Sequence, residues 1–314
     1  MRILSMSGFV PEQICDTVRF TQYTGERTIS HYCGYASDFI SQVIQDDSID
    51  GAVYPKSCDS TRILTSYLSA RGKFLYQINI PAYESFGGED FFAESIKSYK
   101  AAVENYYGNS IDDIHCRAEK INLRNKAISQ SYDQIREFSY TDYLEHIHHM
   151  LKKPLAEQEW KGDIKSGKAS DKNVFLIGSF LSNIEIPRMI EQAGMTVVGD
   201  TLPESGRLAS AQPVALSGDI YKEIAKSILS MRLSPTQNSF RKILEKDIEE
   251  IRKKAVKGVI FITQKYCESY DYLYSVYQPV LRSMGISVLQ FSVNDTEDTG
   301  KAALALEAFA DTLR

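Results

Sequence analysis

Two segments far apart in the sequence share one pattern, in which a short apolar run is followed by a cysteine and then by a helical pattern. The first segment spans residues 50–60 and contains Cys58, and the second spans residues 257–269 and contains Cys267. In both, a glycine opens the run, and an acidic residue and a serine follow the cysteine. Each segment therefore predicts a buried strand, then a thiol, then a helix.

The position of these thiols points to a functional site. In an open parallel sheet, the groups just beyond the carboxyl ends of the strands line the ligand crevice. Cys58 and Cys267 are expected at that edge. Cys33 adds a third thiol, because it precedes a helical pattern whose apolar positions, from Tyr35 to Ile44, lie on one face. A thiol at a helix start is near the positive end of the helix dipole, which favours the thiolate that binds metal.

The order of strand and helix patterns predicts an α/β protein with two Rossmann-like (flavodoxin-like) parallel-sheet domains and an added helical layer. We expect residues 1–160 to form the first domain, which contains Cys33 and Cys58, residues 161–172 to form a polar linker, and residues 173–314 to form the second domain, which contains Cys267. The helical layer is expected at residues 90–153, as part of the first domain. Near the N-terminus, Pro11 and Glu12 predict a helix that continues through Val18.

The composition excludes several classes of protein. The 314 residues are 43% hydrophobic and 25% charged, as is usual for a soluble globular protein. A net charge of -5 does not favour binding to nucleic acid, since such proteins usually carry a basic face. The N-terminus lacks the apolar core of a signal peptide, and no run approaches the roughly twenty apolar residues that span a bilayer. We therefore expect a cytoplasmic protein without membrane or nucleic-acid partners.

The five cysteines are few, odd in number and widely spaced, which favours metal or redox chemistry over a disulfide framework. Three thiolates suit an iron-sulfur cluster with one iron that has no protein thiolate, or a zinc site with an open fourth position. The spacing alone does not choose between these, and a buried cysteine without any ligand role is also common. Cys15 and Cys116 lack a strand before them, so we assign them no metal.

Other candidate sites have weaker patterns. His146, His148 and His149 lack an acidic partner at metal-ligand spacing, which favours a solvated helix face. Gly178 and Ser179 follow a predicted strand without a phosphate-binding motif, so they predict an ordinary turn. For Arg207, which follows the strand that ends at Asp200, an anionic ligand and a surface salt bridge are equally compatible with the sequence. Three tyrosines flank the thiols and are expected to shield a cluster: Tyr32, Tyr35 and Tyr266.

These residues resemble the D-component family of 2-hydroxyacyl-CoA dehydratases, which includes subunits of benzoyl-CoA reductase. The resemblance covers most of the chain. It rests on His31-Tyr-Cys33, on Asp50-Gly-Ala-Val-Tyr-Pro-Lys-Ser-Cys58-Asp59, on Ile190-Glu-Gln-Ala-Gly-Met-Thr-Val-Val-Gly-Asp200 with Gly206-Arg207, on Gly258-Val-Ile to Cys267-Glu268, and on Leu306-Glu-Ala-Phe309. One departure is Ala305, which stands where the family usually has an arginine.

The resemblance implies a [4Fe-4S] cluster held by Cys33, Cys58 and Cys267 between the two domains. It implies a lyase that dehydrates an acyl-CoA substrate through a ketyl radical, with an electron from an ATP-dependent iron-sulfur activator protein. The partner is expected to be a related subunit or a second copy. A benzoyl-CoA reductase-like subunit and a non-catalytic binding subunit are the alternatives.

The sequence also suggests groups around the cluster. Asp59 and Glu268 adjoin two of the predicted ligands and are expected to tune the cluster by hydrogen bonding, with Arg207 as a candidate substrate contact. No residue stands out as a catalytic base.

Overall fold

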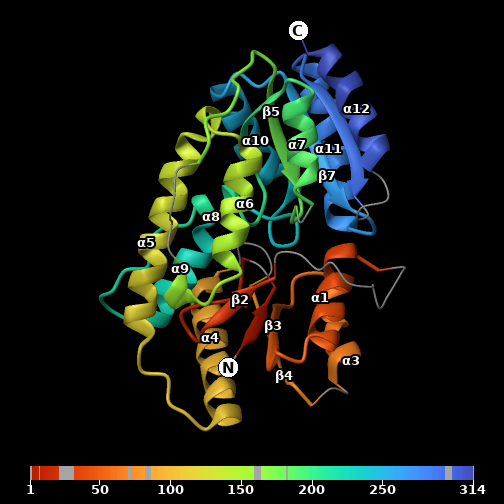
Figure 1. Ribbon diagram of the computed structural model, residues 1–314. Coiled ribbons are helices and arrows are strands. Elements are labelled where there is room, and N and C mark those ends of the chain that lie inside the picture. Colours follow the sequence, from red (N-terminus) through yellow and green to blue (C-terminus); the bar gives the residue numbers. More distant parts are fainter. Residues whose placement is uncertain are drawn as a thin grey trace. The chain divides into compact units, whose positions relative to one another are not determined.

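The protein contains two four-stranded sheets in which all the described neighbouring strands are parallel (Figure 1). Helices follow the strands along the chain, and the predicted α/β fold with two parallel-sheet domains is confirmed. The structure is a computed structural model and describes residues 2–6, 8–20, 32–69, 72–81, 86–158, 164–181, 183–293 and 299–313.

The chain divides into two compact units that alternate along the sequence. The first unit comprises Met1–Ser129, His149–Trp160 and Leu208–Arg232, and the second comprises Gln130–His148, Lys161–Arg207 and Leu233–Arg314. A single boundary at residues 161–172 would assign Leu208–Arg232 to the second sheet. These residues belong to the first unit because their helix packs on a helix of that unit, and a contact between elements so distant in sequence leaves no local pattern.

The first sheet has the strand order β2-β1-β3-β4. Successive side chains of β3 alternate between two cores, since Ala52 and Tyr54 lie in one apolar cluster and Val53 lies in another. Both faces of this sheet are therefore buried, as parallel strands require. Its strands are β1 (Ile3–Ser5), β2 (Thr17–Arg19), β3 (Gly51–Pro55) and β4 (Phe74–Ile78).

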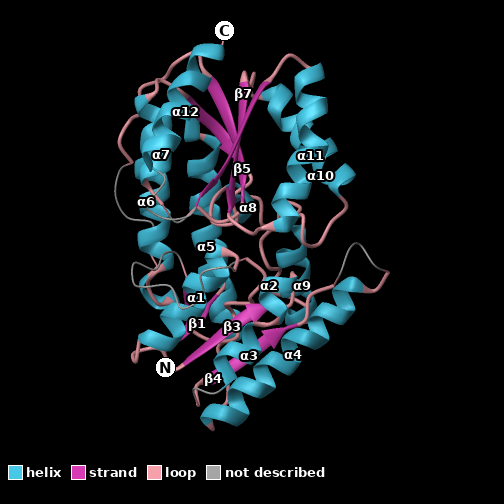
Figure 2. Cartoon of the chain, turned by 90° about the vertical axis from the view of Figure 1, so that its right-hand side faces the viewer, coloured by secondary structure: helices cyan, strands magenta, loops and turns pink. Residues whose placement is uncertain are grey.

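Helices cover both faces of the first sheet. On one face, Phe39 and Ile40 of α1 and Leu64 of α3 share a core with Tyr54. On the other face, α4 packs against β4 and against α9 (Figure 2). The helices named here are α1 (Gly34–Gln45), α3 (Leu64–Leu68), α4 (Gly88–Tyr107) and α9 (Ile220–Ser230), and the short helix α2 (Asp59–Arg62) precedes α3.

The N-terminal residues correct one prediction. Instead of a helix from Pro11 through Val18, the chain forms a turn at residues 12–14 and then the strand β2, in which Val18 pairs with Leu4 of β1. Both strands have three residues, which is too short for the period of two to be visible in the sequence. Tertiary pairing decides the structure of this segment.

The second sheet repeats the order of the first as β6-β5-β7-β8. In β7, Val259 and Phe261 face the core that α10 and α11 cover, and the helices α7 and α12 pack on β6 and β8. The strands are β5 (Asn173–Gly178), β6 (Thr196–Asp200), β7 (Gly258–Gln264) and β8 (Ser287–Val293). The helices are α7 (Glu185–Gln192), α10 (Phe240–Lys253), α11 (Glu268–Ser283) and α12 (Thr299–Thr312).

The predicted helical region between residues 90 and 153 is present as α4, α5 (Ile114–Asp133) and α6 (Tyr140–Leu151). Its assignment to the first domain is only partly right. Residues Gln130–His148, which include most of α6, belong to the second unit. Tyr140 on α6 shows why, because its hydroxyl donates a hydrogen bond to Asp200 at the end of β6.

Candidate functional site

Cys58 lies beyond the carboxyl end of β3 and is the residue that caps the N-terminus of α2. Thr61 holds it in place. The Cys58 N–H donates to Thr61 Oγ1 at 3.0 Å, Thr61 Oγ1 donates to the Cys58 carbonyl at 2.9 Å, and Cys58 Sγ lies 3.7 Å from the same oxygen. Thr61 is buried, so this local ring of contacts fixes the backbone that carries the thiol.

Cys33 is buried and caps the N-terminus of α1, where its carbonyl accepts a 2.9 Å hydrogen bond from the Ser37 N–H. The neighbouring Tyr32 hydroxyl donates a hydrogen bond to the Ser60 carbonyl, two residues after Cys58. Burial raises the pKa of Tyr32, and negative charge on Cys58 and Cys33 raises it further. The structure therefore brings the two predicted ligands of the first unit to one phenol.

Cys267 caps the N-terminus of α11, three residues after β7 ends at Gln264. Its carbonyl accepts hydrogen bonds from the N–H groups of Tyr270 and Asp271, both at 3.2 Å. The preceding Tyr266 has a φ of 66°, in the left-handed region that side chains other than glycine seldom adopt. A tight turn thus carries the chain from the end of β7 to the thiol.

Cys58 and Cys267 occupy equivalent places in the two sheets. In the orders β2-β1-β3-β4 and β6-β5-β7-β8, each cysteine follows the third strand and begins the next helix. Between the first and third strands of such a sheet the connections turn in opposite directions, and ligands bind at the carboxyl ends beside that point. Both thiols lie just beyond a strand end, as predicted. That this edge of each sheet carries chemistry stays a prediction.

A buried polar cluster lies at the carboxyl end of β6 in the second unit. Asp200 Oδ1 accepts from the N–H groups of Leu202 and Gly206, both at 2.8 Å, and Oδ2 accepts from the hydroxyls of Ser205 and Tyr140 at 2.6 and 3.0 Å. Four donors satisfy this fully buried carboxylate, as its charge requires. Asp200 therefore has a structural role: it shapes the loop that leads to Arg207.

Glu204 and His148 lie beside this loop. Glu204 Oε1 accepts from the Leu181 N–H at 2.9 Å and lies 3.8 Å from His148 Nε2, and the imidazole stacks on Phe180 with ring centroids 5.4 Å apart. Both side chains are buried. Among the residues that the structure describes, His148 Nε2 and Glu204 Oε2 have no hydrogen-bond partner. The same unit contains other buried polar atoms without a partner among the described residues, which include Ser179 Oγ and Gln237 Oε1.

Tyr270 links this polar cluster to Cys267. Burial raises the pKa of Tyr270, the Arg207 guanidinium lowers it, and negative charge on Cys267 and Glu204 raises it. Arg207 and Glu204 are themselves buried. Within the second unit, the charges of the predicted ligand Cys267, the candidate substrate contact Arg207 and the carboxylate of Glu204 therefore all affect the pKa of the same tyrosine.

The remaining candidates lie as follows. Asp59 and Glu268 are exposed, and Asp59 pairs with Arg62 at 3.7 Å. The expected solvated face holds for the exposed His149 but not for the buried His148. Cys116, which we assigned no metal, is exposed on α5.

The other thiol without an assigned metal, Cys15, is buried, and its sulfur lies 2.8 Å from the Tyr99 hydroxyl. Sequence reasoning missed Thr61, which contacts Cys58, and Glu204, which lies beside His148.

The described residues contain no group of three or more His, Cys, Asp or Glu side chains that is arranged to hold a metal ion. Cys33 and Cys58 belong to the first unit, and Cys267 belongs to the second. No helix among the described residues combines the length and the apolar character needed to cross a membrane.

The fold and the thiols define a class of protein: two parallel α/β sheets, each with a cysteine that starts the helix after its third strand. The chain belongs to the family described as 2-hydroxyglutaryl-CoA dehydratase, D-component, whose profile matches residues 1–313. A search among curated proteins finds no match. The chain is thus a component of the 2-hydroxyacyl-CoA dehydratase type, in a family whose members work with partner subunits.

Proposed function

We propose that this chain is the iron-sulfur subunit of a 2-hydroxyacyl-CoA dehydratase-like enzyme, with Cys33, Cys58 and Cys267 as ligands of a [4Fe-4S] cluster. The observation that carries the proposal is the equivalence of Cys58 and Cys267, each of which begins the helix after the third strand of its own sheet. The family match over the whole chain supports the class of substrate.

The donor set suits such a cluster. Iron-sulfur clusters are held by thiolates, and three cysteines leave one iron without a protein thiolate. All three cysteines occupy the N-cap position of a helix. Within the first unit, negative charge on Cys33 and Cys58 raises the pKa of the same tyrosine, Tyr32. When bound, a cluster of this kind supplies one-electron chemistry.

The chain's own residues would hold and orient the reacting groups. Thr61 fixes the backbone of Cys58. Arg207 offers a buried cation to an anionic part of the substrate. In this proposal, His148 Nε2 or Glu204 Oε2, which are buried and have no hydrogen-bond partner among the described residues, accepts the proton that the substrate loses. In this proposal the electron comes from an ATP-dependent iron-sulfur activator, and a related subunit or a second copy completes the enzyme.

The first test is the iron and acid-labile sulfide content of anaerobically purified chain, together with Cys267→Ser and Cys116→Ser variants. We expect about four iron and four sulfide per chain for the unaltered protein, and the EPR signal of a reduced cluster after dithionite treatment. Cys267→Ser should lose most of the iron. Cys116→Ser should keep it, because Cys116 is an exposed residue of α5 without a strand before it.

Equal iron in the two variants would contradict the ligand assignment. Circular dichroism of each variant separates loss of a ligand from loss of the fold. Folded, anaerobically reconstituted protein that contains neither iron nor sulfide would instead favour a non-catalytic binding subunit with the same fold. Cys33→Ser and Cys58→Ser extend the test, since both should behave as Cys267→Ser does.

A further inference from the structure

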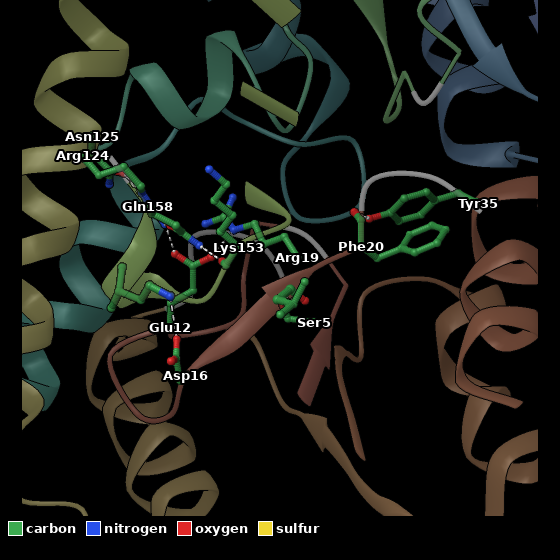
Figure 3. A network of polar contacts seen from close by, with 12 residues as sticks. Ser5, Glu12, Asp16, Arg19, Phe20, Tyr35, Arg124, Asn125, Lys153 and Gln158 are labelled. Atoms are coloured by element: carbon green, nitrogen blue, oxygen red, sulfur yellow. Dashed lines mark hydrogen bonds and ion pairs between the residues drawn. The ribbon is translucent and has the colours of Figure 1, made fainter. Parts of the chain in front are cut away.

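The first unit buries an ion cluster that the proposed dehydratase chemistry does not use. Glu12, in the turn before β2, lies between the guanidinium groups of Arg19 at the end of β2 and Arg124 on α5 (Figure 3). The side chains of Arg19, Glu12 and Arg124 are 6%, 5% and 1% exposed. All three residues belong to the first unit.

Arg124 and Glu12 are well satisfied. Arg124 Nη1 lies 2.6 Å from Glu12 Oε2 and donates to Gln158 Oε1 at 2.7 Å, and its Nε and Nη2 donate to Asn125 Oδ1. Glu12 also accepts a hydrogen bond from Arg19 Nε. Burial by itself would raise the pKa of Glu12, but the two arginines lower it to about 2. Glu12 is therefore a carboxylate, and it already accepts from both guanidinium groups.

The charges of the cluster do not balance. Two guanidinium groups and one carboxylate leave one positive charge in excess. Within the described part of the chain, neither arginine forms an ion pair with a second carboxylate. Burying an uncompensated charge is costly, so an excess of this kind points to a counter-charge from outside the cluster.

The excess charge has an unused donor. Among the described residues, Arg19 Nη1 and Thr17 Oγ1 are buried without a hydrogen-bond partner. Thr17 and Arg19 are two positions apart on β2, so their side chains lie on the same face of the strand. Among the described strands, β2 pairs with β1 and is the edge strand of its sheet, and Arg19 is the last residue of β2. The two donors therefore lie on the same face of β2, with Thr17 at the start of the strand and Arg19 at its carboxyl end.

From this geometry we infer that the first unit binds an oxyanion, a carboxylate or a phosphate group, that accepts hydrogen bonds from Arg19 Nη1 and Thr17 Oγ1. One negative charge on the ligand neutralises the cluster. The planar guanidinium suits both kinds of oxygen donor. Neither Thr17 nor Arg19 is a proposed ligand of the iron-sulfur cluster. The inferred oxyanion site can therefore be tested independently of the proposed function.

The experiment is thermal unfolding of the whole chain in acetate, phosphate and chloride at equal ionic strength and pH. An oxyanion that binds only the folded protein raises the Tm by roughly 3–5 °C at a hundredfold excess over its Kd, relative to chloride. A rise in acetate identifies a carboxylate site, and a rise in phosphate alone identifies a phosphate site. The absence of a rise in both overturns the inference.

Three variants separate binding from general salt effects. Arg19→Met removes the excess charge, so it should abolish the oxyanion-dependent rise and leave the fold intact in chloride, because Glu12 keeps its pair with Arg124. Glu12→Gln increases the excess charge and should enlarge the rise. Arg241→Met removes the same charge from an exposed position on α10 and should leave the rise unchanged.

Binding at this site, a surface effect of the anion and a structural role of Arg19 predict different Tm values for the variants. An adventitious effect of the anion on the protein surface would give the same Tm rise in Arg19→Met as in Arg241→Met, and this result overturns the site. A purely structural role of Arg19 predicts that Arg19→Met loses Tm equally in acetate, phosphate and chloride, which also overturns it. If Arg19→Met does not fold, Arg19→Lys takes its place. A binding site predicts that the oxyanion-dependent rise in Tm is smaller in Arg19→Lys and larger in Glu12→Gln, and equal rises in both variants overturn the inference.

Discussion

At the scale of single residues, burial gives two cysteines of the same unit opposite chemistry. Cys15 is fully enclosed with its sulfur against the Tyr99 hydroxyl, and burial raises the pKa of the Cys15 thiol to about 12. Cys116 is exposed on α5. Since the thiolate is the nucleophile, these two residues should differ in reactivity although the sequence shows no motif around either.

We predict that iodoacetamide modifies Cys116 at pH 8 and leaves Cys15 intact, as peptide mass spectrometry can determine. The raised pKa also fixes a pH dependence. A thiol whose folded pKa lies above its ordinary value of 9.0 contributes stability that is complete below pH 9 and is lost as the pH rises toward about 12. Cys15→Ala should therefore lose less stability across that interval than the unaltered chain. Equal labelling of both thiols at pH 8 would contradict the prediction.

The residues of the site differ in how well the sequence predicts them. Cys33, Cys58 and Cys267 were predictable at helix starts, because a strand, a cap and an amphipathic helix are all local patterns. The capping-box spacing from Cys58 to Thr61 was a signal of the same local kind that we did not use.

Other contacts left no such signal. His148 and Glu204 meet across more than fifty residues, and the Glu12 and Arg124 pair spans more than a hundred. No local pattern records these contacts, so they required the structure.

At the scale of elements, the loop after β6 depends on a glycine. A Cβ at Gly206 would lie 2.1 Å from the Asp200 carbonyl oxygen and 2.8 Å from the Tyr132 hydroxyl. The Gly206 N–H also donates to the Asp200 carboxylate. The close approach of backbone to backbone leaves no room for a side chain, and it positions α8 (Gly206–Ala209), which carries Arg207.

We predict that Gly206→Ala destabilises the protein by about 2–4 kcal/mol, in the range of overpacked or disrupted buried sites. Gly300→Ala is the matched control, because nothing lies within 4 Å of its added Cβ and the residue belongs to α12. The control should be neutral or slightly stabilising, since alanine favours a helix over glycine. Chemical unfolding of both variants measures the difference, and equal stabilities would show that the loop can shift without cost.

Elements also differ in how well the sequence predicts them. The six longer strands, from β3 to β8, have five to seven residues and are bounded by glycine, proline or polar residues, so their patterns are visible. The strands β1 and β2 have three residues each. The predicted helix from Pro11 was wrong because the pairing of β2 with β1 overrides local preference.

At the scale of the whole molecule, the two compact units alternate along the chain. The helix α9 supplies Ile220, Ile224 and Ile228 to the core of the first unit, although it follows β5 and β6 of the second. Burial of each such side chain contributes on the order of 1.5–3 kcal/mol. The sequence could not predict this assignment, because the linker composition at residues 161–172 indicated one boundary where the chain passes between the units several times.

We predict that a fragment of residues 1–160 does not form a stable first unit, because it lacks the surface that α9 provides to α4. Adding a peptide of residues 208–232 in trans should increase the dispersion of its amide NMR signals and its resistance to proteolysis. A scrambled peptide of the same composition is the control. A fragment that is fully folded without the peptide would show that α9 is dispensable for this core.

The alternating units have a consequence for synthesis on the ribosome. A chain that emerges from its N-terminus displays β1, β3 and α4 long before α9, and the first unit is complete only when Arg232 has left the exit tunnel. At bacterial or eukaryotic elongation rates, the interval between the emergence of residues 160 and 232 is on the order of 4–14 s. Throughout that time the face of α4 that packs on α9 stays exposed. The nascent chain therefore presents an apolar segment to which chaperones can bind, and this segment is buried in the folded protein.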